Sequence, residues 1–478
     1  MIAKLLNYNK KFSNSTTLMS WFSFSSKILN LFLVLPLILR TFNENELAVY
    51  FIFVTIISTS NIIDFGFKST FVRIFTYASV GLKTIDKLDV KSIKPKRNEV
   101  NWELTEKIFS ATKRIYFIIS ILLLIFLSVV GTLLVKKPIN LNEDVLTLWL
   151  AWGFVVVTST IGFYGKIYIC YLEGFNKVAL LKKVEGYFSF ITVFSKLVVL
   201  YFWPTIFTLI IVEKIWLVIN LVRNLYLSKK INDNKISNFV KIKGDSLFIK
   251  KVFNLAWKNG VSGILSVGLT NFTGLIYAQI GNTTMVNSYL LSLRVLTLLR
   301  DFSKVPFYSK IPLLSKLRAE QNIEKLASLS KKTMTLSNVI FIFGAIIIGL
   351  FSNQILTFIG SNVKFVSYDL WLLLSIAFFI HRYGAMHLQL YLTTNHIISH
   401  IVDSISGLIF IIICLLLYQY LELYTFPIAM IISYLSCHSW VSAKYSLRSM
   451  NKSFWSFDKY NIFIFLLCVL FLILYYYG

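Results

Sequence analysis

Long apolar stretches separated by short polar segments run through the whole chain. A helix needs about 20 consecutive apolar residues to cross the hydrocarbon core of a bilayer, and stretches of that length recur with only short gaps. The pattern predicts about thirteen membrane-spanning helices, with no soluble domain between them. The expected spans are Leu18–Thr41, Leu47–Tyr77, Tyr116–Val135, Val145–Tyr171, Val184–Phe202, Thr205–Leu227, Val252–Ile280, Met285–Val305, Thr333–Phe351, Leu370–Tyr391, Ile398–Tyr420, Pro427–Tyr445 and Ile462–Tyr477.

Composition supports an all-α polytopic membrane protein. Hydrophobic residues make up 56% of the 478 positions, more than the roughly 45–50% of soluble domains. The net charge of +26 would suit nucleic acid, but the basic residues gather on alternate loops, as they do at the cytoplasmic ends of membrane helices. We therefore expect no nucleic-acid partner and a cytoplasmic N-terminus. The basic segments are Lys4–Lys11, Lys83–Arg114, Lys177–Lys183, Lys229–Lys251, Lys304–Lys332 and Lys444–Lys459.

Cysteine and histidine positions give no sign of a metal site or a disulfide framework. All the cysteines fall inside predicted spans, and the histidine spacing matches no metal-binding pattern. Neither a metal nor a cofactor is expected. The cysteines are Cys170, Cys414, Cys437 and Cys468, and the histidines are His381, His387, His396, His400 and His438.

Two short internal matches lie at equivalent places in the two halves of the chain. Tyr171–Lys177 leaves the fourth predicted span and Tyr391–His396 leaves the tenth, while Asp64–Ser69 resembles Asp301–Lys304. Many transporters consist of two structural repeats around a central site. We therefore expect two six-helix bundles, at residues 1–240 and 241–448, followed by one additional transmembrane helix within residues 449–478.

Several basic residues lie deep inside predicted spans with no acid three or four positions away. A charge at bilayer depth costs at least a few kcal/mol, so such residues usually face a watery cavity or an anionic ligand. The candidates for a cationic substrate site are Lys27, Lys196, Lys258, Arg294 and Arg382. The two arginines are the strongest, because a guanidinium can hold a phosphate through two parallel hydrogen bonds. The alternative is an interhelical ion pair with Glu213 or Asp403.

Two of these lysines belong to polar stripes at helical spacing. Lys27 aligns with neighbouring serines and an asparagine on the first predicted helix, and Lys258 with serines and threonines on the seventh. Such stripes favour a cavity lining, although small polar residues also favour helix packing.

A few acidic and titratable residues are candidates for ion coupling. His400 precedes Asp403 by three residues near a predicted helix start, and histidine titrates near neutrality. The same pair could instead cap the helix. Asp64 and Lys68, four residues apart, are expected to form a local ion pair. The ion-coupling candidates are Asp64, Glu213, His400 and Asp403.

Three segments resemble a known transporter family. Ile63–Arg73, Glu173–Lys177 and Met386–Tyr391 before Asn395 are similar to the corresponding parts of Wzx-type O-antigen and polysaccharide-unit flippases. These flippases belong to the multidrug/oligosaccharidyl-lipid/polysaccharide (MOP) exporter superfamily, and the resemblance covers about residues 15–448.

The resemblance implies a V-shaped pair of helical lobes in the bacterial inner membrane. The implied substrate is an undecaprenyl-pyrophosphate-linked oligosaccharide, which alternating access moves from the cytoplasmic to the periplasmic leaflet. Membrane lipids and other polysaccharide-assembly proteins are the implied partners. The cationic residues agree with a pyrophosphate substrate, because this group needs positive charge at depth.

Two alternatives differ in the side chains they require. A drug or metabolite exporter of the same superfamily would be expected to have an acid-lined pocket, and Asp64, Glu213 and Asp403 are few beside the basic residues. A membrane polysaccharide polymerase would be expected to carry a large external loop with catalytic side chains, but the predicted external turns are short. The chain shows no nucleophile triad, phosphate-binding glycine loop or acid pair, so we do not expect an enzyme.

Overall fold

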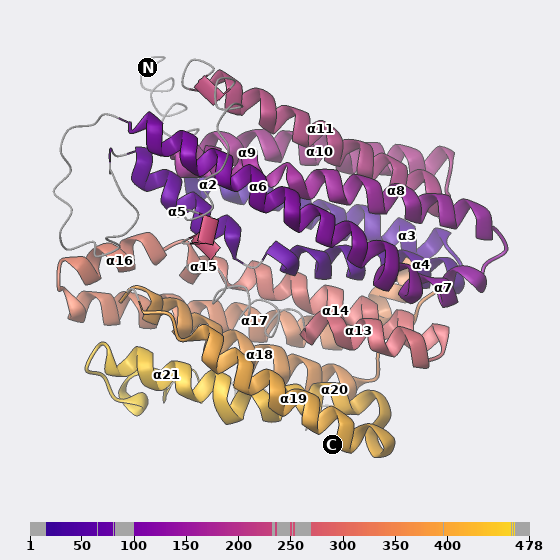
Figure 1. The fold of residues 1–478 in the computed structure, drawn as a ribbon. Helices are drawn as coiled ribbons and strands as arrows, with labels where there is room; N and C mark the ends of the chain where they lie inside the picture. The colour runs from indigo at the N-terminus through magenta and orange to yellow at the C-terminus, as the bar shows by residue number, and fades with distance from the viewer. Residues whose placement is uncertain are drawn as a thin grey trace, which may run out of the picture. The chain divides into compact units, whose positions relative to one another are not determined.

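A computed structural model of the chain describes residues 16–64, 66–79, 81, 100–231, 235–236, 249–250, 252–253, 269–394, 396–459, 461 and 463. The regular structure of this part of the chain is helical (Figure 1). The chain divides into two compact units, Met1–Gly260 and Val261–Gly478. Lys258 and nearly all of the predicted last span, 462–477, lie outside the described residues.

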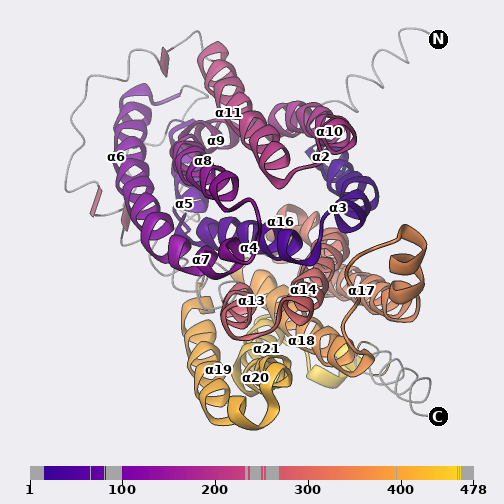
Figure 2. The ribbon, with the colours of Figure 1, turned by 90° about the vertical axis from the view of Figure 1, so that its right-hand side faces the viewer.

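The helices of the first unit follow the predicted spans. α10 packs along α2, α11 packs along α8, and the two pairs join where α10 meets α11 (Figure 2). The short π-helical segments η1 and η4 continue the helices on either side of them. The elements are α2 (Thr16–Leu29), η1 (Asn30–Val34), α3 (Leu35–Thr41), α4 (Glu44–Ser60), η2 (Asn61–Asp64), α5 (Phe67–Ser79), α6 (Trp102–Phe126), η4 (Leu127–Gly131), α7 (Thr132–Asn140), α8 (Val145–Tyr164), α9 (Lys166–Gly174), α10 (Val178–Phe202) and α11 (Ile206–Lys230).

The second predicted span, Leu47–Tyr77, is not one continuous helix. α4 ends at Ser60, a 3₁₀ turn follows, and Gly66 adopts a φ of 67° before α5 begins. A left-handed conformation suits glycine because it has no Cβ. One oxygen of Asp64 accepts a hydrogen bond from the backbone N–H of Lys68 at 3.1 Å, so it satisfies a free donor at the start of α5. The carboxylate of Asp64 therefore lies at a break between two helices and not on one continuous helix.

Glycines allow close helix packing around α8 and α9. A Cβ at Gly162 or Gly165 would overlap the side chains of Leu217 and Leu221 on α11. A Cβ at Gly174 would likewise overlap Phe75 on α5. Small residues at such crossings are typical of membrane helices. In lipid there is no hydrophobic effect to bring helices together, so their association depends on close van der Waals packing.

The second unit is organised around α18, which packs against α14, α17, α20 and α21. Helices on several sides leave little of α18 exposed, so its polar residues must find partners inside the protein. The elements are α13 (Leu269–Ile280), α14 (Thr283–Ser303), α15 (Val305–Tyr308), α16 (Ile311–Ala319), α17 (Ile323–Ile359), α18 (Tyr368–Leu392), α19 (Ser399–Leu421), η7 (Glu422–Tyr424), α20 (Thr425–Ser433), η8 (Tyr434–His438) and α21 (Ser439–Arg448).

Six helical stretches of the described chain are long and apolar enough to cross a membrane. One of them, Ser399–Arg448, holds two predicted spans, because α19 turns back through η7 to pack against α20. α18 is not among the six, and it carries His381, Arg382 and His387. The total of about thirteen spans, the internal repeat and the additional last helix stay predictions. The six stretches are Phe22–Thr41, Trp102–Asn140, Val145–Gly174, Val178–Phe202, Ile323–Ile359 and Ser399–Arg448.

Candidate functional site

Arg382 is the most deeply buried of the predicted cations that the structure describes. It lies on α18 with 2% of its surface exposed. Its Nη1 donates a hydrogen bond to the side-chain oxygen of Asn338 on α17 at 2.9 Å, and its guanidinium carbon lies 5.2 Å from the centre of the Phe341 ring. Among the described residues, Nε and Nη2 have no hydrogen-bond partner.

These contacts leave the charge of Arg382 without an acid among the described residues. A guanidinium stays protonated, so the buried charge must be stabilised by some acceptor. The side-chain nitrogen of Asn338 also lacks a hydrogen-bond partner among the described residues. Two buried side chains therefore offer donors to one small region of the second unit, an arrangement that suits an anion with several acceptor oxygens.

Arg294, the other predicted arginine, lies on α14 and is partly buried. It does not take part in the hydrogen bond or the ring contact of Arg382. The structure thus places the two arginines in one unit on different helices.

Lys196 in the first unit has an acidic partner. Its ammonium lies 2.6 Å from Oε2 of Glu213, which links α10 to α11. This is the interhelical ion pair that the sequence offered as the alternative to a substrate site. The neighbouring Lys214 is buried and lies 3.4 Å from the hydroxyl of Ser159, a neutral group. Lys27 is exposed on the surface of α2, with its ammonium 5.5 Å from the Phe24 ring.

Arg223 is a buried cation that the sequence interpretation missed. Nη1 donates to Asn220 at 2.6 Å, and Nη2 donates to Asn224 at 2.7 Å. The guanidinium also lies 5.0 Å from the centre of the Phe188 ring. Asn220, Arg223 and Asn224 share one face of α11 because they are three and four positions apart. Two asparagines on the same helix face as an arginine, inside a predicted span, were the sequence signal that could have identified this buried cation.

The expected ion pair between Asp64 and Lys68 is wrong. The ammonium of Lys68 lies 2.9 Å from Glu173 on α9 instead. Asp64 accepts a hydrogen bond from the hydroxyl of Tyr116 at 2.8 Å. The reason is the break before α5. Asp64 lies in the preceding 3₁₀ turn and not on α5, so a spacing of four residues does not bring its side chain next to that of Lys68 on one helix face.

Asp403 has a partner on another helix. Its Oδ1 lies 2.8 Å from Nδ1 of His438, at the end of η8. His400 is partly buried one turn before Asp403 on α19. Of the ion-coupling candidates, Asp64 and Glu213 lie in the first unit, and His400 and Asp403 lie in the second.

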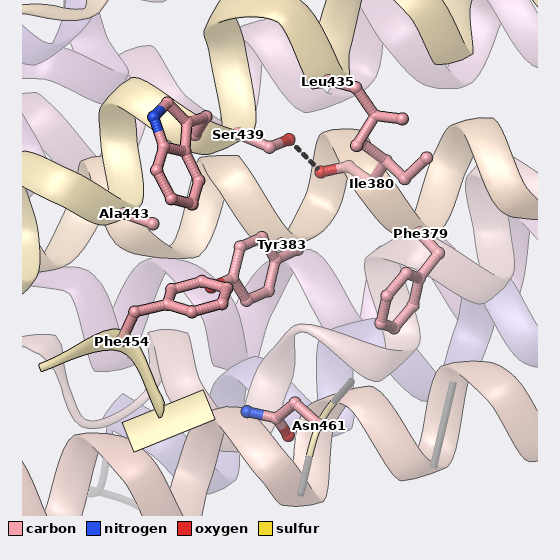
Figure 3. Close-up of a pocket in the computed structure, with 9 residues that line it drawn as sticks. Phe379, Ile380, Tyr383, Leu435, Ser439, Ala443, Phe454 and Asn461 are labelled. Carbon is pink, nitrogen blue, oxygen red and sulfur yellow. Dashed lines mark hydrogen bonds between the residues drawn. The ribbon is translucent and has the colours of Figure 1, made fainter. Parts of the chain in front are cut away.

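A cavity of about 280 Å³ lies beside α18 (Figure 3). None of the described residues that line it is charged, and most of them are apolar or aromatic. The hydroxyl of Ser439 faces α18 and donates to the carbonyl of Ile380 at 2.7 Å, so this group is already satisfied (Figure 3). The cavity suits an apolar group, and the donors of Arg382 are not part of it. Its lining residues are Phe379, Ile380, Tyr383, Leu435, Ser439, Trp440, Ala443, Phe454 and Asn461.

The fold is similar to those of solved MATE transporters and of a lipid II flippase. An inward-facing multidrug resistance MATE family transporter of the MOP superfamily matches 91% of this chain and 94% of its own, with 11% identity and a TM-score of 0.63. Lipid II flippase MurJ, in an inward closed conformation, matches 96% and 98%, with 13% identity and a TM-score of 0.60. The eukaryotic MATE transporter AtDTX14 matches 93% and 99%, with 14% identity and a TM-score of 0.56.

These likenesses show the fold of the chain. It is the all-α fold seen in these MATE transporters and in MurJ. No protein-family model matches the chain, and no curated protein matches it. Fold alone does not set the substrate, which has to be argued from the site.

Proposed function

We propose that this protein is a flippase that moves an undecaprenyl-pyrophosphate-linked oligosaccharide repeat unit across the bacterial inner membrane by alternating access. The observation that carries the proposal is Arg382, a buried guanidinium whose described hydrogen bond goes to a neutral amide. A pyrophosphate has negative charge and many acceptor oxygens. It would therefore accept hydrogen bonds from the N–H groups of Arg382 and Asn338 that have no partner among the described residues. Membrane lipids and other polysaccharide-assembly proteins are the proposed partners.

Other buried cations add to this argument. Lys214 and Arg223 donate hydrogen bonds to neutral groups, and the partly buried Lys166 lies 3.8 Å from the centre of the Phe163 ring. Each of the three is also attracted by a carboxylate beyond hydrogen-bond distance, so its charge is only partly offset; these carboxylates are Glu213, Glu185 and Asp64, respectively. The desolvation of each such charge costs several kcal/mol unless a counter-charge offsets it. Lys196 has Glu213 for this purpose. We therefore rest the anion site on Arg382 first, with Arg294, Lys27 and Lys258 as further candidates.

The three chemical parts of the proposed ligand would bind in different surroundings. The pyrophosphate would bind the guanidinium, and the sugar would need hydroxyl and amide partners. The polyprenyl chain could remain in lipid, because it is as apolar as the bilayer interior. Support for a lipid-linked substrate also comes from the likeness to a protein described as a lipid II flippase, which extends over nearly the whole chain.

Export of drugs or metabolites is the second candidate, since a multidrug resistance transporter shares the fold. A pocket for a cationic drug needs an acid that has no cationic or hydrogen-bonding partner in the protein. Two of the candidate carboxylates have such partners: Glu213 has Lys196, and Asp403 has His438. Asp458 accepts hydrogen bonds from Tyr383 and Asn461. This pattern favours an anionic substrate over a cationic one.

Reconstituted flipping of a lipid-linked oligosaccharide tests the proposal. The purified chain in proteoliposomes is expected to carry a fluorescent polyprenyl-pyrophosphate-linked oligosaccharide between leaflets, measured by its accessibility to a membrane-impermeant reagent. Deletion of the gene is expected to abolish the surface polymer and to leave the lipid-linked unit in the cytoplasmic leaflet. A normal amount of polymer in a clean deletion, or export of cationic dyes with no flipping, would contradict the proposal.

A further inference from the structure

A second buried polar cluster in the second unit joins three elements. Asp403 on α19 and His438 at the end of η8 are 3% and 1% exposed, and His381 lies beside them on α18. The rings of His381 and His438 stack with a centre-to-centre distance of 4.8 Å and an angle of 17°. The ring of Tyr434 lies 4.7 Å from that of His381.

Both ring nitrogens of His438 face hydrogen-bond acceptors. Nδ1 lies 2.8 Å from Oδ1 of Asp403, and Nε2 lies 3.2 Å from the backbone carbonyl oxygen of His381. A neutral imidazole has one N–H, so it can donate to only one of these oxygens. Beside an ionised Asp403, the neutral ring would aim a lone pair at the other oxygen. One additional proton on the ring gives both nitrogens an N–H to donate, and it removes the repulsion between that lone pair and the oxygen.

The extra proton also suits the burial of the pair. A carboxylate beside a neutral histidine would leave a net negative charge in a site that is almost closed to solvent, which is unfavourable. A carboxylate beside an imidazolium has no net charge. Histidine binds a proton more tightly than aspartate does in water, so the ring is the natural place for it.

We infer that Asp403 and His438 form a proton-binding site, and that the bound proton ties η8 to α18. When the proton leaves, one of the two contacts of His438 must be lost. The contact with the His381 carbonyl is the longer one and goes to a neutral group, so it is the weaker of the two. Deprotonation thus loosens the link to α18.

The link is placed where it can affect the proposed anion site. His381 is adjacent to Arg382 on α18, so a shift of this helix changes the position of the guanidinium. A Cβ at Gly384 would overlap the His438 ring, which shows how closely the two segments approach. η8 is a π-helical segment, a local irregularity that often accompanies functional sites in helices.

Other titratable groups lie near the pair on several elements. α18 contributes His381, α19 contributes His400 one turn before Asp403, and η8 itself contributes Tyr434 and Cys437. α20 contributes no titratable side chain, and Lys444, Tyr445 and Arg448 of α21 are exposed. From α14, Arg300 approaches α18, with its guanidinium carbon 5.8 Å from the centre of the Phe378 ring. These surroundings favour a single proton, on His438.

The donor set does not suit a metal cation. Sodium, like other hard cations, prefers several oxygen ligands, and the pair offers one carboxylate and a ring nitrogen. The described residues contain no group of three or more metal-binding side chains. The inference names the proton as the coupling ion of the proposed function. The transport test below rests on that function, whereas the test of protonation does not.

Nitrogen-15 NMR of the full chain in lipid bilayers, with labelled histidine, tests the protonation directly. At about pH 8, where a histidine in water is neutral, one histidine is expected to show both ring nitrogens protonated. His438→Gln is expected to remove this signal, and the control His396→Gln is expected to keep it. A ring of His438 with one protonated nitrogen would overturn the inference, and this measurement on the unmodified chain needs no substrate.

Transport in proteoliposomes then tests the coupling. Asp403→Asn and His438→Gln are expected to lower pH-gradient-driven flipping roughly ten- to a hundredfold, as for a lost charged hydrogen bond. A full response to the gradient in both folded variants would overturn the coupling. If the chain flips no lipid-linked oligosaccharide while His438 carries two protons, the proposed function fails and the proton site stands. If flipping occurs while His438 is neutral, the proton site fails and the function stands.

Discussion

Individual buried and partly buried cations in the described residues fall into two groups that the sequence alone does not separate. Lys196 and Lys68 have carboxylate partners, Glu213 and Glu173. Arg382 instead contacts a neutral side chain and an aromatic ring. A cation that is neutralised inside the protein has little charge to offer a ligand, whereas one with neutral contacts keeps its full attraction for an anion. The two groups therefore predict different results for the same kind of substitution.

For Arg382, we expect the loss to appear in function. Each charged hydrogen bond to a phosphate is worth about 1.5–3 kcal/mol, so Arg382→Ala should lower substrate binding or flipping roughly ten- to a hundredfold. Arg382→Lys should restore activity only in part, because lysine keeps the charge but lacks the planar pair of donors. Flipping in proteoliposomes is the measurement, with the exposed Arg448→Ala as the matched control.

The amount of folded protein must be measured beside it, by size-exclusion chromatography. Wild-type flipping by a correctly folded Arg382→Ala variant would exclude this residue from the anion site. Arg294, Lys27 and Lys258 would then be the next residues to substitute.

For Lys196, we expect the loss to appear in stability. Glu213→Gln removes the carboxylate and leaves a buried ammonium without its counter-charge. Breaking a buried pair costs about 3–5 kcal/mol, and the partial exposure of Glu213 reduces this to roughly 1–2 kcal/mol. The double variant Lys196→Met with Glu213→Gln should recover most of that loss, because no unpaired charge remains. Thermal unfolding in detergent is the measurement, and a double variant less stable than Glu213→Gln would contradict the argument.

At the scale of the helices, breaks and close contacts decide where polar groups lie. The break between α4 and α5 brings Asp64 to the hydroxyl of Tyr116, and the π-helical η8 ends at His438, beside Asp403. In each case an irregular segment places a titratable side chain inside an apolar span. Regular helices surround these positions, so the irregular turns must be specified by local sequence.

Gly66 provides the test of the first break. It has a φ of 67°, which costs a residue with a Cβ about 1–2 kcal/mol. Gly66→Ala should therefore lower the thermal unfolding midpoint. The control is Gly153→Ala in α8, where a Cβ would have no neighbour within 4 Å and alanine should be neutral or stabilising. Equal stability of the two variants would show that the break does not depend on the left-handed conformation of Gly66.

Across the whole molecule, the sequence predicted the spans better than the contacts between them. Apolar runs define helices such as α10 and α17 because burial in lipid depends on length and hydropathy. The break at Asn61–Asp64 and Gly66 was not predicted, because the apolar residues on both sides of it were interpreted as one span. Partners on other helices, such as Glu173 for Lys68, could not be predicted, because hydropathy carries no information about which faces meet.

The orientation of the chain is the remaining whole-molecule prediction, and it follows from the basic loops. Reporter fusions after Arg97 and Lys243 should be cytoplasmic, and one after Asn142 should be periplasmic, because lysine and arginine are retained on the cytoplasmic side. Alkaline phosphatase, active only in the periplasm, is the reporter, and green fluorescent protein, fluorescent in the cytoplasm, gives the complementary readout. A fusion after Gly478 tests the additional helix, since thirteen spans place that end in the periplasm and twelve place it in the cytoplasm. Phosphatase activity at Lys243 would reverse the orientation, so pyrophosphate carried toward the periplasm would have to enter from the opposite side of the protein.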